Sequence, residues 1–199
     1  MPKMIRILCE GLAIVLFTLI CTRCLCKNMK KRDFRFVPWL PYVLTGCGSA
    51  MLFLLSGLSP RTFCGIAFLF VLLYASVQDH STHEADDILS VMMLMLAVTN
   101  TSEATVLSQL LGAAIVCGAQ MLIALCGKKR MGIGGADIKL STAAALLLGF
   151  YKGVIGFMLG LLIAVVAQLI MTHRKKEQRT QPFALLPYLS VGLWIGFLI

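Results

Sequence analysis

The chain has 199 residues, of which 59% are apolar and 14% are charged, and its formal net charge is +9. Soluble domains carry about 45–50% apolar and about 25% charged residues, so a single buried core cannot absorb this excess. The mean hydropathy of +0.88 indicates an all-α, polytopic integral membrane bundle in a lipid bilayer. We expect no nucleic-acid partner, because Lys and Arg gather in the cytoplasmic loops of membrane proteins.

Apolar runs divide the chain into about eight predicted transmembrane helices. The first run is expected to remain as a helix, since Ile20 before Cys21 is too bulky for the small-residue pattern of signal-peptide cleavage. Two spans, 87–98 and 137–150, are short, at about 20 Å against a hydrocarbon core of about 30 Å. The predicted spans are 5–22, 39–55, 62–78, 87–98, 104–126, 137–150, 154–172 and 183–199.

The distribution of basic residues agrees with this partition. Segments 23–35, 128–139 and 174–179 hold six, four and four of the 18 Lys and Arg residues. With eight spans, all three segments fall on one side of the membrane. The positive-inside rule places that side in the cytoplasm and both termini outside.

Clustered cysteines raise the question of a metal site. Cys21, Cys24 and Cys26 lie close together, but a zinc site needs about four ligands and no second cluster completes this one. His80 and His83 also lack a suitably spaced partner. We therefore expect juxtamembrane thiols that stay reduced in the cytoplasm, and no metal.

Five of the nine acidic residues lie at the predicted cytoplasmic face. An ionisable residue at the end of a membrane helix is a functional candidate by default. For the two acids that open the span 87–98, helix capping is the simpler interpretation. It fails for the acid that ends the span 62–78, where the helix dipole is negative. These five are Asp79, Glu84, Asp86, Asp87 and Asp137.

A glycine-rich run, residues 132–137, precedes the sixth predicted helix and ends at Asp137. Glycine permits tight backbone conformations and close approach of another chain. A phosphate-binding loop is the competing interpretation, but Asp137 would repel phosphate and no Gly-Lys-Ser/Thr follows. Gly149-x3-Gly153 and Gly156-x3-Gly160, further along, have the small-residue spacing of close helix packing, and we assign them that role alone.

The segment Gly134-Gly135-Ala136-Asp137-Ile138-Lys139-Leu140 resembles the GxGD motif of the type IV prepilin peptidases, which are intramembrane aspartic proteases. Asp79 resembles the family's first aspartate, which ends an apolar helix about eight residues before an acid that opens the next; here that acid is Asp87. Residues 181–187 resemble a late Pro-Phe-x-x-x-Pro segment. The resemblance covers residues 63–199. Ala136 stands in place of the last glycine of GxGD.

The resemblance implies an endopeptidase that removes the basic leader peptide from a prepilin or pseudopilin precursor. Its catalytic pair would be Asp79 and Asp137, one ionised and one protonated, with no cofactor. The site would face the cytoplasm, in the inner membrane of a bacterium. Paired CxxC motifs of the methylating enzymes are absent from the sequence, so no N-methyltransferase activity is expected.

Substrate contacts are expected around this pair, and the acidic residues there would attract the basic leader. Residues 61–199 would form the peptidase core, and residues 1–60 two N-terminal helices whose role the sequence does not define. The expected substrate-binding residues are Gly134, Gly135, Ala136, Lys139, Glu84, Asp86 and Asp87.

Two other classes of protein remain open at this point. Presenilin-like proteases share GxGD but are longer and have Tyr where Gln78 stands. A transporter or assembly scaffold would use Asp79 and Asp137 for ion coupling, although transporter acids usually lie near the midplane within repeated halves. Ion flux abolished by Asp137→Asn would favour the transporter.

Overall fold

The computed structural model describes residues 2–83, 85–99, 106–126, 134–174 and 184–199. These residues form eight α-helices and no strand, which confirms the all-α bundle and the helix count predicted from the sequence. The helices are α1 (Pro2–Lys31), α2 (Leu40–Ser56), α3 (Pro60–Thr82), α4 (Asp87–Thr99), α5 (Val106–Cys126), α6 (Gly135–Leu148), α7 (Phe150–Arg174) and α8 (Leu186–Leu198).

Length and exposed apolar surface identify a polytopic membrane protein. Four helices are long and apolar enough to cross a membrane, within α1, α3, α5 and α7, and shorter apolar helices accompany them. Large apolar side chains are exposed along these helices, as at Leu16, Leu122 and Leu162, where a soluble monomer would bury them. Helices α4 and α6 have 13 and 14 residues, so the predicted short spans are confirmed. Helix α8 also has only 13 residues, which the sequence prediction missed.

Helix α1 is longer than predicted, because the basic segment that was expected to be a loop continues the helix to Lys31. Thr22 bonds to Thr45 of α2 at 2.7 Å, and one to two turns later Cys26 and Met29 are buried. Packing therefore extends the helix past its apolar run. Its last basic residues, Lys30 and Lys31, suit the negative end of the helix dipole.

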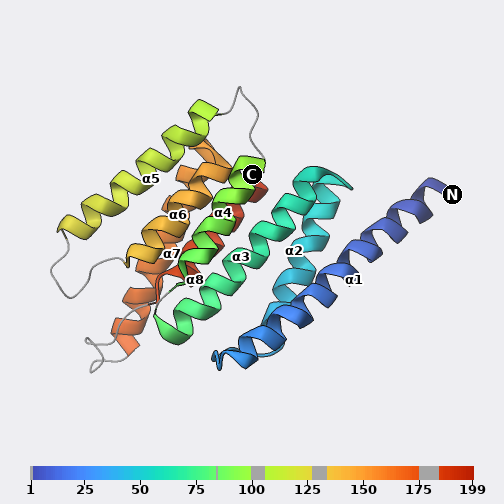
Figure 1. Ribbon diagram of the computed structural model, residues 1–199, viewed down its shortest axis with the longest axis horizontal. Coiled ribbons are helices and arrows are strands. Elements are labelled where there is room, and N and C mark those ends of the chain that lie inside the picture. Colours follow the sequence, from blue (N-terminus) through green and yellow to red (C-terminus); the bar gives the residue numbers. More distant parts are fainter. Residues whose placement is uncertain (1, 84, 100–105, 127–133, 175–183) are drawn as a thin grey trace.

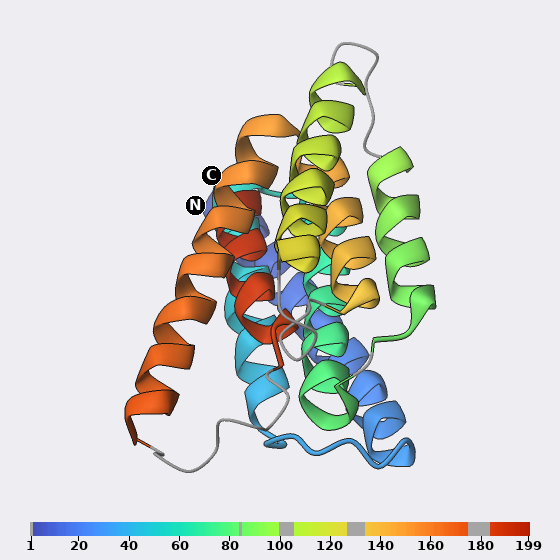
Figure 2. The same cartoon turned by 90° about the vertical axis from the view of Figure 1, so that its left-hand side faces the viewer.

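Helix α3 lies inside the bundle, between α2, α4 and α8, while α1 and α5 lie along opposite sides (Figure 1). Its side chains Phe68 and Leu72 are buried, and the Phe68 ring stacks on Phe197 of α8 with centroids 5.4 Å apart. The C-terminal half of α7 stands away from the other helices (Figure 2). Contacts with α2, α4 and α8 thus fix the position of α3 in the bundle.

Glycines join α7 to α8 at very close range. A Cβ added at Gly160 would lie 2.8 Å from the Cα of Leu189, and one at Gly156 would lie 3.0 Å from the carbonyl oxygen of Gly192. No larger side chain fits between these backbones, so the packing role predicted for Gly156 and Gly160 is confirmed. This contact holds α8 closely against α7.

The linker between α1 and α2 is attached to the C-terminal end of α3. The backbone N–H of Arg35 donates to Ser81 Oγ at 3.0 Å, and the Phe34 ring meets Tyr74 edge-on at 5.9 Å. Arg32 pairs with Asp86 just before α4 at 2.7 Å. The N-terminal helices thus contact the same end of the bundle that carries the acidic residues.

Candidate active site

Asp79 lies in the last turn of α3 and is buried, with 5% of its surface exposed. The helix continues to Thr82 instead of ending at residue 78, so Asp79 is inside the helix and not at its boundary. His83, in the left-handed conformation with φ 55°, ends α3 and donates its backbone N–H to the carbonyl oxygen of Asp79 at 2.9 Å. Helical hydrogen bonds therefore hold the backbone before and after Asp79.

The carboxylate of Asp79 reaches the start of α8. Its Oδ2 accepts a hydrogen bond from the backbone N–H of Leu186 at 3.0 Å, in a buried environment. Leu186 is the first residue of α8, whose N–H has no acceptor within its own helix. Asp79 thus acts as a cap supplied by another helix, and α8 fixes the orientation of the carboxylate.

Asp137 lies in the first turn of α6, which begins at Gly135 with Gly134 as the N-cap. Its backbone N–H donates to the carbonyl oxygen of Gly134 at 3.1 Å. The carboxylate turns back and accepts from the backbone N–H of Gly134, the reciprocal contact of a capping box. These contacts fix Asp137 at the positive end of α6.

The structure brings these two acids together from segments 58 positions apart in the chain. The carboxylate of Asp79, in α3, lies close enough to that of Asp137, in α6, to interact with it electrostatically. Asp79 is buried and Asp137 is half-buried. Two carboxylates within electrostatic range of each other cost more free energy to ionise together than singly.

The glycine-rich run needs less conformational freedom than the sequence suggested. Gly134 has φ −63° and ψ 142°, an extended conformation open to any residue. Nothing lies within 4 Å of a Cβ added at Gly135, and Ala136 is already helical. Alanine at the last glycine position of the motif therefore causes no strain. Residues 132 and 133 lie outside the described residues.

Asp86 and Asp87 form ion pairs at the same end of the bundle. Lys139 of α6 pairs with Asp87 of α4 at 2.8 Å, and both side chains are largely exposed. Arg32 pairs with Asp86, and this hydrogen bond raises the pKa of the Arg32 guanidinium above its usual value. Glu84 lies outside the described residues. The first of these ion pairs joins α4 to α6, and the second joins the linker after α1 to the start of α4. Both lie at the end of the bundle that carries Asp79 and Asp137.

Sequence reasoning missed a buried polar pair behind Asp137. Ser141 Oγ lies 2.6 Å from the backbone carbonyl oxygen of Asp137 and 2.9 Å from Gln120 Oε1 of α5. Gln120 is fully buried, and among the described residues its Nε2 has no hydrogen-bond partner. A glutamine within the apolar run 104–126 was a usable signal, because polar residues inside membrane helices are costly. The N–H of Leu186 left no side-chain signal in the sequence.

We expect Ser141→Ala to destabilise the protein by about 1–3 kcal/mol, because it removes the described hydrogen bond of the buried Gln120 amide. Unfolding of the purified protein in detergent measures this change. The double variant Ser141→Ala/Gln120→Leu removes both partners and should recover most of the lost stability. Equal stability of the single and double variants would contradict this account of the pair.

Among the described residues, no group of three or more His, Cys, Asp or Glu side chains is placed to hold a metal ion. A cluster around His80 and His83 is thus not found in that part of the chain.

Comparison with protein families gives a match that covers both acids. The model of the type IV leader peptidase family matches residues 66–172, which include both Asp79 and Asp137. No curated protein and no solved structure matches the chain. The family match and the positions of Asp79 and Asp137 in the structure are therefore two separate findings.

Proposed function

The chain belongs to the type IV leader peptidase family, and from this premise we propose that it is an intramembrane aspartic endopeptidase. It removes the basic leader from prepilin or pseudopilin precursors at the junction between leader and apolar helix. Asp79 and Asp137 are its catalytic residues.

One observation carries this proposal: two acids far apart in sequence interact with each other at one end of the bundle. Both belong to the segment that the family model covers. Each is also fixed by a backbone amide, Asp79 by Leu186 and Asp137 by Gly134. A pair that only capped helices would have no need to lie within electrostatic range.

The proposed reaction uses the shared proton of the pair. The ionised carboxylate takes a proton from water, whose oxygen attacks the scissile carbonyl carbon, while the protonated carboxyl polarises the carbonyl oxygen. The N–H of Leu186 keeps Asp79 in place during this exchange, and the helical first turn of α6 does so for Asp137. No cofactor takes part in these steps.

We place this end of the bundle at the cytoplasmic face of a bacterial inner membrane. The basic end of α1 and its linker lie there, beside Asp86 and the end of α3. Clustered Lys and Arg residues favour the cytoplasmic side. A precursor whose basic leader is still in the cytoplasm would then present its junction to the pair.

Residues 61–199 form the proposed peptidase core, and residues 1–60 the N-terminal pair of helices. The family match begins at residue 66, close to that boundary. Through Arg35 and Phe34, the N-terminal part contacts the last turns of α3. We propose that it supports the position of Asp79.

Substrate contacts are proposed for the rim of the site. Asp86 and Asp87 carry exposed carboxylates, paired with Arg32 and Lys139. Exposed ion pairs contribute about 0–1 kcal/mol, so basic leader residues can compete for both acids at low cost. Glu84 joins them in the proposal, and Gly134, Gly135 and Ala136 offer a surface with little side-chain bulk for the substrate backbone.

A pair of precursors tests this function. One has a Lys/Arg leader and the other the same leader with Gln at those positions, and both are mixed with the purified chain in lipid vesicles. We expect cleavage of the basic precursor at the leader junction and, since charge attracts the leader, a kcat/KM on the order of tenfold lower for the neutral one. Mass spectrometry identifies the products.

Asp86→Asn/Asp87→Asn is the matched variant, because it removes the rim charge and leaves the proposed catalytic pair. It should cleave both precursors with similar kcat/KM. Absence of any product with the wild-type chain would overturn the peptidase proposal. Equal cleavage of the two precursors by the wild-type chain would overturn only the role of the rim acids.

A further inference from the structure

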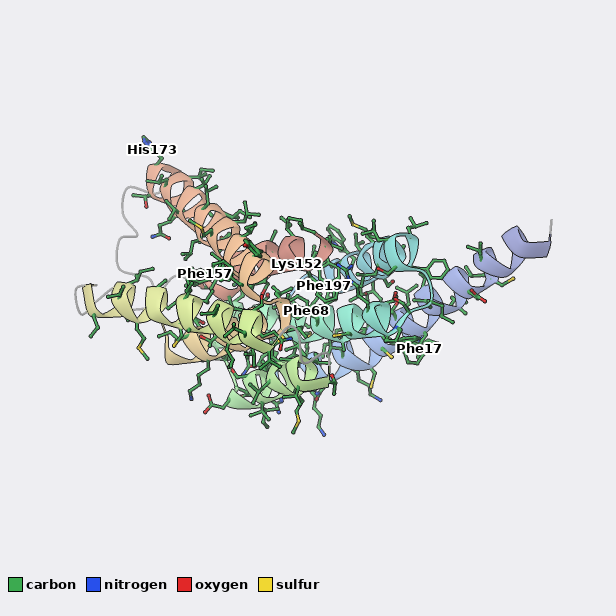
Figure 3. The ribbon with its side chains drawn as sticks, turned by 90° about the horizontal axis from the view of Figure 1, so that it is seen from above. Phe17, Phe68, Lys152, Phe157, His173 and Phe197 are labelled. Carbon is green, nitrogen blue, oxygen red and sulfur yellow. The ribbon has the colours of Figure 1, made fainter. Side chains whose placement is uncertain are left out.

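A polar cavity lies at the opposite end of the bundle from Asp79 and Asp137. It has a volume of about 270 Å³, and its walls come from the starts of α3, α5 and α7 and the ends of α6 and α8. Arg61, Lys152, Ser108 and Gln109 line it together with Phe197. Figure 3 labels Lys152 of α7 and Phe197 of α8, which lie near each other in that view. The proposed peptidase reaction uses none of these residues.

The cavity lies at the depth of lipid headgroups. Arg61 and Asp79 are 18 residues apart in α3, which corresponds to about 27 Å along the helix. A hydrocarbon core is about 30 Å thick, so the two residues lie near opposite membrane surfaces. The cavity therefore faces the leaflet on the other side of the membrane from the carboxylate pair.

Two cations share this cavity without an acidic partner. Within the described part of the chain, neither Arg61 nor Lys152 pairs with a carboxylate, yet the two are close enough to repel each other. Arg61 donates to the carbonyl oxygen of Phe197 at 3.2 Å and lies over its ring. Lys152 is in the first turn of α7, where the helix dipole disfavours a cation. A bound anion would offset the repulsion between Arg61 and Lys152. It would also offset the unfavourable interaction of Lys152 with the dipole of α7.

Neutral donors complete the cavity. Gln109 lines it with only 6% of its surface exposed, and its amide makes no hydrogen bond to any described residue. Ser108 Oγ accepts the backbone N–H of Phe150 at 3.1 Å, and its own O–H has no acceptor within the described part of the chain. The first N–H groups of α7 also lack acceptors within the helix. Charged and neutral donors thus surround a space of headgroup size.

We propose that this cavity binds the phosphodiester headgroup of an anionic phospholipid. Arg61 and Lys152 provide the charge, and Ser108 and Gln109 donate hydrogen bonds to the phosphate and headgroup oxygens. A zwitterionic lipid brings no net charge to offset two cations, so an anionic one is preferred. The bound lipid connects the ends of five helices at this surface.

Native mass spectrometry of the purified full-length chain in detergent, titrated with phosphatidylglycerol, tests the proposal. We expect Lys152→Gln to weaken retention of the lipid at least about tenfold, since it removes one charge-assisted contact. Arg61→Gln/Lys152→Gln should abolish retention at this site. Lys152→Gln loses no described side-chain hydrogen bond, so it carries the test even if the double variant fails to fold.

Arg23→Gln/Lys27→Gln is the matched control, because it removes two exposed cations of α1 near the other end of the bundle. It should retain the lipid as the wild-type chain does. Phosphatidylcholine and inorganic phosphate, titrated in separate arms, should bind more weakly than phosphatidylglycerol. Equal binding of either one, or undiminished retention by Lys152→Gln, would overturn the lipid site.

Discussion

Asp79→Asn and Asp137→Asn each lower the rate of precursor cleavage by on the order of 10⁴-fold, because either change removes a group that acts as a unit with its partner. The amide is similar in size to the carboxylate but can neither take a proton from water nor share one. A time course of product formation with purified variants in vesicles measures the loss.

Asp87→Asn is the control for this prediction. Asp87 is an exposed acid at the same end of the bundle, paired with Lys139. Its loss changes the rim charge but not the pair, so we expect a reduction of about tenfold or less. If Asp87→Asn were as inactive as Asp137→Asn, the catalytic role would not be specific to the pair.

Gly192→Ala destabilises the protein by about 3 kcal/mol, at the upper end of the cost of overpacking. The added methyl group would overlap the backbone nitrogen of Gly160 and the carbonyl oxygen of Gly156. Because both neighbours are helix backbone, α7 and α8 must separate. Detergent-based unfolding of the purified protein measures the free energy, and the cleavage rate should also fall, since α8 carries the N–H that holds Asp79.

Gly118→Ala provides the matched substitution in α5, where no atom lies within 4 Å of the added methyl group. Alanine favours a helix over glycine by about 1 kcal/mol, so this variant should be as stable as the wild-type chain or slightly more so. Wild-type stability of Gly192→Ala would mean that α7 and α8 are not packed as closely as described.

The number of helices could be predicted because lipid-exposed helices appear in the sequence as apolar segments, which charged residues separate from one another. The end of α1 could not, since four basic residues lie in its last part, where the helix continues through buried Cys26 and Met29. Packing against α2 decides that boundary, and a one-dimensional pattern does not record it. The short length of α8 was missed for a similar reason, because apolar residues precede it as well.

The candidate site was partly visible in the sequence. The glycine-rich run pointed to Asp137, and the end of an apolar run pointed to Asp79. The hydrogen bond from Leu186 to Asp79 could not be foreseen, because a backbone amide has no side-chain signature and lies 107 positions away. The pairing of Asp87 with Lys139 likewise depends on how α4 lies against α6.

The central claim is that Asp79 and Asp137 form one catalytic unit, and a double-mutant cycle tests it most directly. Single-turnover cleavage of a basic-leader precursor is measured for the wild-type chain, Asp79→Asn, Asp137→Asn and the double variant. A shared unit predicts that the double variant is no slower than either single variant. Losses that multiply in the double variant, or near wild-type cleavage by either single variant, would contradict the claim.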